Sequence, residues 1–125
     1  MMPRRVLASM VVLVFALGGV VLADPPTLSI EQQATLDPVN FGVLVTVDVN
    51  CGDPAPTEFQ VEVAVRQGDV AGTSGGVFFP STGGRQQVSV DVFGPFVAGD
   101  ASASATLVCG PLTEGLLLGA TIKIS

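Results

Sequence analysis

The residue types that most often carry catalysis or bind transition metals are scarce in this sequence. Histidine is absent, which removes the commonest general base and the commonest transition-metal ligand. The single lysine, Lys123, lies two residues from the C-terminus on a predicted outward face, where a solvated charge is expected. The two cysteines, Cys51 and Cys109, have no histidine, lysine or second thiol beside them in the sequence to activate a thiolate. We therefore expect no catalytic residues and no cofactor.

Four residues with side-chain oxygens surround the predicted turn "GDPAP": Asp48, Asn50, Asp53 and Glu58. Such oxygens are ligands that calcium accepts, so a calcium site is one reading of this cluster. The spacing lacks the ligand pattern of an EF-hand loop, and "GDPAP" has the composition of an ordinary turn. The sequence thus favours a solvated loop over a metal site.

A glycosidase would need two carboxyl groups framed in a cleft, one of them with a raised pKa. Asp48 and Asp91 are on outward faces of strands that are predicted to share a sheet. The chain has no Trp and no Tyr, so it lacks the aromatic platforms that usually hold sugar rings. We expect that the protein is not an enzyme.

The first 23 residues have the layout of a secretory signal peptide. Arg4 and Arg5 form a basic start, an apolar run covers residues 6–21, and Val21 and Ala23 occupy the −3 and −1 positions of a small-residue cleavage site. The sequence predicts a signal-peptide helix over residues 1–23, a mature domain over residues 24–125, and a secreted location, extracellular or in the cell envelope. An uncleaved membrane anchor is the alternative, because the apolar run reaches 18 residues if it is extended to Ala23.

Charge narrows the classes of partner. The mature chain keeps three basic residues, Arg66, Arg85 and Lys123, against all eleven acidic ones, so its net charge is about −8. Such a field repels nucleic acid and anionic lipid surfaces. We expect no nucleic-acid partner, and contact with a membrane only through an uncleaved signal segment.

Apolar and polar residues alternate with a period of two throughout the mature chain, which predicts β-strands and no helix. The seven predicted strands cover residues 27–36, 40–51, 58–67, 77–79, 85–93, 101–110 and 115–125. Short, evenly spaced antiparallel strands with one dry face predict an all-β, seven-stranded immunoglobulin-like β-sandwich. An up-and-down barrel is the structural alternative.

The two cysteines are predicted to form a disulfide. Cys51 is in phase with the apolar positions of residues 43–49, and Cys109 is in phase with Ala101, Ala103 and Ala105. Both side chains therefore point inward, each from the last position of its strand. If the strands alternate in direction, these two positions lie at the same end of the sandwich. A bridge that closes a loop of about 60 residues stabilises a fold by roughly 4 kcal/mol in the chain-entropy model.

The stretch "ASASATLVCG" has two different faces. Its inward alanines leave space that Phe59, Leu116, Leu118 and Phe41 are expected to fill. Its outward residues are small and uncharged, and the neighbouring strands extend the same flat surface. This surface is the predicted partner-binding face, with the residues Gln60, Glu62, Arg66, Ser102, Ser104, Thr106 and Thr121.

Three segments carry a resemblance to a known group of proteins: Val63 to Gln67, Val88 to Val92, and Phe96 to Ala103. With them the chain resembles uncharacterised secreted bacterial domains, mostly actinobacterial, that have a signal peptide, an Ig-like β-sandwich and an inter-sheet disulfide. The resemblance implies this fold and export, and it carries no catalytic residues. The chain departs from antibody-type domains in having no Trp and no Tyr, and it lacks a further central cysteine pair that similar domains often carry.

Taken together, these features predict a secreted Ig-like module that binds a protein or a cell-envelope component, or has a structural role there. The alternative is a small extracytoplasmic enzyme or an enzyme inhibitor that uses surface acidic residues or loops.

Overall fold

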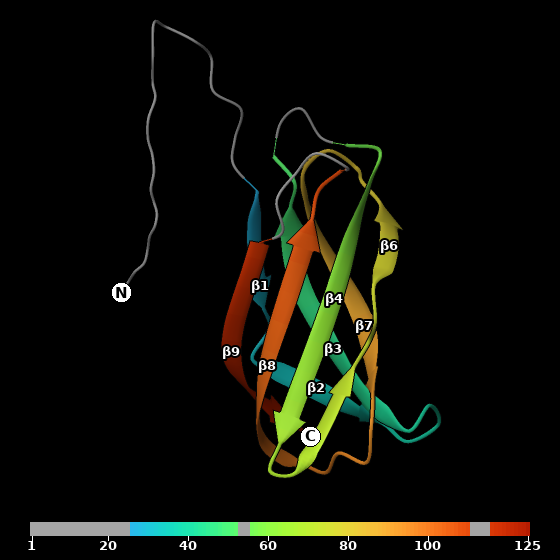
Figure 1. Cartoon of the computed structure of the whole chain (residues 1–125), viewed down its shortest axis with the longest axis vertical. Coiled ribbons are helices and arrows are strands. Elements are labelled where there is room, and N and C mark those ends of the chain that lie inside the picture. Colours follow the sequence, from blue (N-terminus) through green and yellow to red (C-terminus); the bar gives the residue numbers. More distant parts are fainter. Residues whose placement is uncertain (1–25, 53–55, 111–115) are drawn as a thin grey trace, which may run out of the picture.

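The computed structural model describes residues 26–52, 56–110 and 116–125, which form β-strands and no helix (Figure 1). The all-β prediction is confirmed, and within these ranges no helix could cross a membrane. The predicted signal peptide lies outside the described residues. The strands are β1 (Thr27–Ile30), β2 (Gln33–Asp37), β3 (Gly42–Asn50), β4 (Glu58–Gln67), β5 (Val70–Thr73), β6 (Val77–Pro80), β7 (Arg85–Phe93), β8 (Gly99–Val108) and β9 (Leu116–Ile124).

The strands lie in two layers (Figure 1). The buried apolar side chains of both layers form one core cluster. In the first layer, β3 pairs with β1 and with part of β2 on one side and with β7 on the other. In the second layer, β8 lies between β9 and β4, and β5 and β6 both pair with the opposite edge of β4. The strands that carry the predicted partner-binding residues, β4, β8 and β9, therefore lie side by side in one layer.

The first predicted strand, residues 27–36, is in fact two strands. The chain leaves β3 after Ile30, and Gln33 and Ala34 pair in parallel with Lys123 and Ile124 of β9 before Thr35 returns to β3. Hydrogen bonds from Lys123 N to Gln32 O (2.7 Å) and from Ser125 N to Ala34 O (3.0 Å) fix this crossing. The two layers are therefore joined through β2, and the prediction of purely antiparallel pairing is wrong at this point.

A second difference is β5, which brings the number of strands in the described residues to nine instead of seven. Gln67 pairs with Val70, so β4 and β5 form a hairpin with the two-residue loop Gly68–Asp69. Gly68 has a φ of +59°, the conformation that a glycine-first hairpin turn requires. The Gly-Asp pair is itself a hairpin signal, but the short segment after it contains a glycine and too few apolar residues to show alternation.

The core confirms the predicted inward faces. Val43, Val45, Val47 and Val49 of β3 and Ala101, Ala103 and Ala105 of β8 are buried. Phe59 is 1% exposed and stacks on Phe79, with the ring centroids 5.7 Å apart. It does not lie beside the small residues of β8, because the β4 residues that pair with Ala103 and Ala105 are Val65 and Val63. Phe41 does not fill the core: it is 65% exposed at the end of the β2–β3 loop, where its backbone has a φ of +58°.

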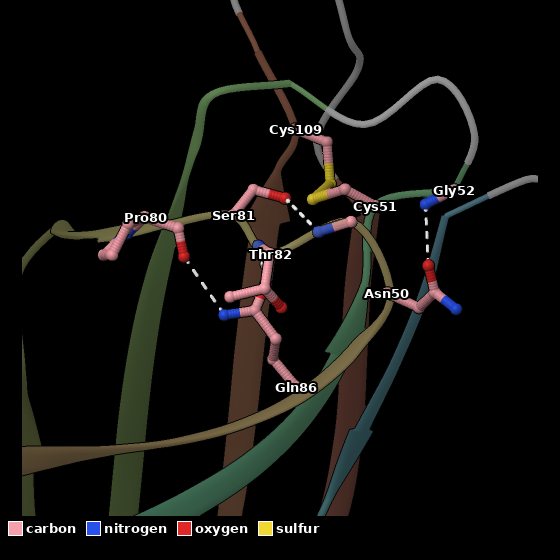
Figure 2. Close-up of a disulfide and its surroundings, with 9 residues drawn as sticks. Asn50, Cys51, Gly52, Pro80, Ser81, Thr82, Gln86 and Cys109 are labelled. Carbon is pink, nitrogen blue, oxygen red and sulfur yellow. Dashed lines mark hydrogen bonds between the residues drawn. A yellow bond between two sulfur atoms is a disulfide. The ribbon is translucent and has the colours of Figure 1, made fainter.

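The predicted disulfide between Cys51 and Cys109 is confirmed. Each cysteine directly follows its strand, β3 in the first layer and β8 in the second, and the Cα atoms are 5.5 Å apart (Figure 2). Beside the bridge, Asn50 Oδ1 accepts a hydrogen bond from Gly52 N (2.8 Å), which turns the chain away from β3. A disulfide of this kind is consistent with an oxidising location outside the cytoplasm.

Candidate functional site

The structure brings the predicted partner-binding residues together on one surface. Strand register places Glu62 opposite Thr106, Arg66 opposite Ser102, and Ser102 opposite Thr121. Each of these residues alternates with a buried neighbour, so all of them point away from the core, and Gln60 and Ser104 do the same. We call this surface the β4–β8–β9 face. It is the outer side of the second layer, which is the near side in Figure 1.

Small side chains make the centre of the β4–β8–β9 face flat. Ala64 lies opposite Ser104, and Ser104 lies opposite Gly119, so three adjacent strands carry almost no side-chain bulk at this level. The polar groups there make few contacts with each other: Ser102 Oγ donates to the Arg66 carbonyl at 3.4 Å, and Thr73 Oγ1 donates to Glu62 at 3.4 Å. Polar groups with few bonds to each other remain available to form hydrogen bonds with a partner that covers this flat surface.

Two shallow hollows lie toward opposite ends of this face. The one nearer the disulfide has a volume of about 340 Å³ and is lined by Glu58, Phe59, Gln60, Phe78, Val108 and Gly110. Phe78 is 62% exposed there, which is unusual for a ring of this size. The other hollow has a volume of about 290 Å³ and lies over Arg66 and the small residues around it, Ala64, Ala71, Gly72, Ser102 and Ser104. An apolar contact and a cationic contact are therefore available at the two ends.

The calcium candidates are not gathered in one place. Asp48 and Asn50 point outward from β3 in the first layer, whereas Glu58 points outward from β4 in the second, and Asp53 lies outside the described residues. Asn50 already uses its oxygen to accept the Gly52 N–H. Among the residues that the structure describes, no three His, Cys, Asp or Glu side chains form a group that could hold a metal ion.

Asp48 and Asp91 share a sheet as predicted, but they are not neighbours. Asp48 pairs with Gln87, whereas Asp91 pairs with Leu44, four residues away from Asp48 along β3. Each carboxyl group instead lies beside a different acidic residue, Glu31 in the first case and Asp37 in the second. Two like-charged carboxyl pairs therefore occupy the outer side of the first layer.

The carboxyl groups of Asp37 and Asp91 interact across β3, from the strands that lie on either side of it. Asp37 pairs directly with Gly42, and Asp91 is two residues before Phe93, the partner of Gly42 on β7. Gly42 has no side chain to separate them, and a Cβ atom there would overlap the carbonyl of Val92. Within the described residues, Asp91 Oδ1 is buried and has no hydrogen-bond partner.

The two members of this pair have opposite electrostatic environments. Asn40 donates to Asp37 from its side chain (Nδ2 to Oδ2, 2.8 Å) and from its backbone, and these bonds lower the pKa of Asp37. The pKa of Asp91 is raised, first by burial and then by the neighbouring Asp37 carboxyl. The negative charge of Asp91, and not that of Asp37, therefore destabilises the folded state.

The pair of Glu31 and Asp48 depends on the irregularity between β1 and β2. Glu31 N donates to the Thr46 carbonyl (2.9 Å), which holds Glu31 beside β3 near Asp48. A hydrogen bond and repulsion from Asp48 raise the pKa of Glu31, and the positive charge of Arg85 partly opposes this. Sequence reasoning missed both pairs, because the pattern of residues 27–36, a segment that contains Glu31 and ends just before Asp37, predicts one unbroken strand.

Replacing Asp91 with Asn should stabilise the protein at neutral pH. An amide at this position can donate to Asp37, and it removes the half-buried charge and the repulsion; because solvent screens this partly exposed site, a gain of no more than about 1 kcal/mol is expected. The raised pKa of Asp91 determines how the gain depends on pH. In the wild type, the contribution of Asp91 to stability is fully present below the ordinary pKa of 3.8 and is lost as the pH rises through the raised pKa. The gain should therefore be full at pH 7 and disappear near pH 3, which thermal unfolding across this pH range would measure.

The matched control is Asp69→Asn, which removes the same charge from an exposed turn position. If Asp69→Asn stabilised the protein as much as Asp91→Asn, the gain would come from lower net charge and the local account would be wrong.

Comparison with known proteins adds no relative: no protein-family model, curated protein or solved structure matches this chain.

Proposed function

We propose that the protein is a secreted Ig-like β-sandwich domain that acts as a binding or structural module. It contacts a protein or a cell-envelope component through the β4–β8–β9 face. The observation that carries this proposal is that face itself: a flat, small-residue centre between a hollow with an exposed phenylalanine and a hollow with an arginine. Aromatic and arginine side chains are the types that most often dominate the energy of protein interfaces.

The strand arrangement supports the Ig-like assignment. One layer contains β1, β3 and β7 and the other contains β4, β8 and β9, which corresponds to the A, B, E and C, F, G strands of Ig domains. The disulfide joins β3 to β8, the positions of the B and F strands that the inter-sheet disulfide of antibody domains connects. Secretion is supported by the residue pattern of the first 23 positions and by the disulfide.

Site-specific photo-crosslinking tests the binding proposal. A photoreactive residue at position 104, at the flat centre of the face, should crosslink the exported protein to a distinct envelope or extracellular protein in the cells that produce it. The same residue at Thr35, on the outer side of the first layer, is the positional control and should give no such product.

A charge variant separates specific binding from accidental proximity. Ser104→Arg places a long cation on the flat centre and should abolish the crosslink from a probe at Thr106, while the melting temperature stays unchanged. Equal crosslinking from positions 104 and 35, or no effect of Ser104→Arg, would contradict the β4–β8–β9 face as the binding surface.

A further inference from the structure

One edge of the first layer is open along β7. β7 pairs with β3 over all nine of its residues, and no other strand in the described part of the chain pairs with it. Gly94 N donates to the Phe41 carbonyl (3.0 Å), which continues the β3–β7 ladder by one pair. This bond identifies Phe41 and Gly94 as a hydrogen-bonded pair of the ladder. Because hydrogen-bonded pairs alternate in an antiparallel ladder, Gln86, Val88, Val90 and Val92 bond to β3. The N–H and C=O groups of the odd-numbered residues, 85 to 93, are therefore directed toward the open edge.

This edge has few of the features that normally prevent strands from pairing edge to edge. Residues 85–93 contain no proline and no lysine, and their register with β3 is unbroken, so there is no bulge. At the end of β7, a Cβ atom on Gly72 of β5 would overlap the Phe93 carbonyl, so β5 lies against it. At its start, the Gln86 side chain bonds to Pro80 O and Thr82 N of the preceding turn. The backbone of residues 85–91 stays available as a template.

The open edge also exposes apolar surface between the two layers. Val88 of β7, Val77 and Phe79 of β6, and Val70 of β5 pack on the core but are only partly buried. β6 and β7 lie on the same side of the molecule (Figure 1). A strand added to β7 would cover part of this surface as well as the free backbone groups.

The sequence of β7 is complementary to itself in one antiparallel register. With Val88 on a two-fold axis, residue numbers in facing positions add up to 176, so Arg85 faces Asp91 of a second copy and Gln87 faces its Ser89. Facing residues of this kind have Cβ atoms about 4.5–5.5 Å apart, and opposite charges there attract. Moving the axis to Ser89 puts Arg85 opposite Phe93, and moving it to Gln87 puts Asp91 opposite Gly83. Among these three registers, the one centred on Val88 alone pairs the opposite charges, and it does so twice.

We propose that the free edge of β7 binds β7 of a second copy of this chain, antiparallel and centred on Val88, with Arg85 of each copy paired with Asp91 of the other. The pairing joins the first layers of both copies into one continuous sheet. Arg85 of the second copy also brings a positive charge to the carboxyl pair of Asp37 and Asp91. This interaction surface is separate from the β4–β8–β9 face, so a dimer still presents two copies of that face.

The oligomeric state of the purified exported chain, measured by sedimentation equilibrium, tests the proposal. An edge-to-edge contact is smaller than the interface of a permanent dimer, so dissociation in the micromolar range is expected. Arg85→Glu and Asp91→Arg should each weaken self-association at least about tenfold, because each replaces two attractive contacts with two repulsive ones. Arg66→Glu makes the same change as Arg85→Glu on the other layer and should leave the association unchanged.

Mixing the two variants gives the decisive result. The Arg85→Glu chain carries acidic side chains at both positions 85 and 91, whereas the Asp91→Arg chain carries basic side chains at both. Every facing charge contact in the mixed dimer is therefore attractive again. An equimolar mixture of Arg85→Glu and Asp91→Arg should form a heterodimer with about the wild-type affinity. Circular dichroism of each variant confirms that it is folded before mixing.

A variant that leaves the charges of β7 unchanged tests the proposal even if Asp91→Arg does not fold. Ser89→Pro removes an N–H that points to the open edge and leaves the bonds to β3, so it should prevent dimerisation. Ser89→Ala is its control, because both lose the hydrogen bond between Ser89 Oγ and Thr46 Oγ1 (2.7 Å). A wild-type chain that stays monomeric up to about 1 mM overturns the proposal. So does a dimer that neither the charge variants nor Ser89→Pro weaken.

Discussion

Replacing Cys51 and Cys109 together with alanine should lower the free energy of unfolding by about 4 kcal/mol. The bridge joins positions 58 residues apart and links the two layers, so its removal frees a large loop in the unfolded chain. For a domain of about 100 residues, this loss corresponds to a fall in melting temperature of roughly 15–30 °C. Thermal unfolding followed by circular dichroism measures it directly.

The control for this prediction is a reducing agent. Reductant should lower the melting temperature of the wild type toward that of the double variant and should leave the double variant unchanged. A double variant that melts at the wild-type temperature would show that β2, which also joins the layers, is sufficient to hold them together without the bridge.

Replacing Phe59 with alanine should cost about 3–5 kcal/mol. Phe59 is 1% exposed in the core and stacks on Phe79, so its loss leaves a cavity that rigid strands cannot close. Urea unfolding measures the change, with an unchanged dependence on urea concentration indicating that the unfolding is still two-state.

The matched control is Phe78→Ala, on the strand that pairs with β4 beside Phe59. Phe78 has the same side chain but is 62% exposed, so its removal should change stability by no more than about 0.5 kcal/mol. Equal losses of stability from the two substitutions would contradict the assignment of Phe59 to the core and of Phe78 to the surface. Because Phe78 lines the hollow on the β4–β8–β9 face, the same variant should reduce partner crosslinking without loss of stability.

Regular alternation made much of this fold predictable from the sequence. In β3, β4 and β8 each inward position could be read from a period of two, and the parity of Cys51 and Cys109 placed both on the inner side. The residues of the β4–β8–β9 face followed from the same reasoning, because the outward positions of a strand are known once the inward ones are. These predictions depend only on the neighbours of a residue along its own strand.

Features that depend on which strands meet could not be read in this way. The segment of residues 27–36, which contains Glu31 and ends just before Asp37, has the pattern of one strand. It nevertheless divides between two layers, because β3 and β9 both provide backbone partners for it. That division brings Glu31 to Asp48 and Asp37 to Asp91, pairs that no spacing in the sequence indicates.

The sequence by itself thus determined the strand faces, the small-residue surface and the disulfide, because side-chain alternation and thiol parity are local properties of an extended chain. Only the tertiary structure decided the path of β2, the two carboxyl pairs and the open edge of β7, because each depends on hydrogen bonds between segments far apart in the sequence. A strand carries the same alternation at the centre of a sheet and at its edge, and only its neighbours determine whether its second row of backbone groups is satisfied.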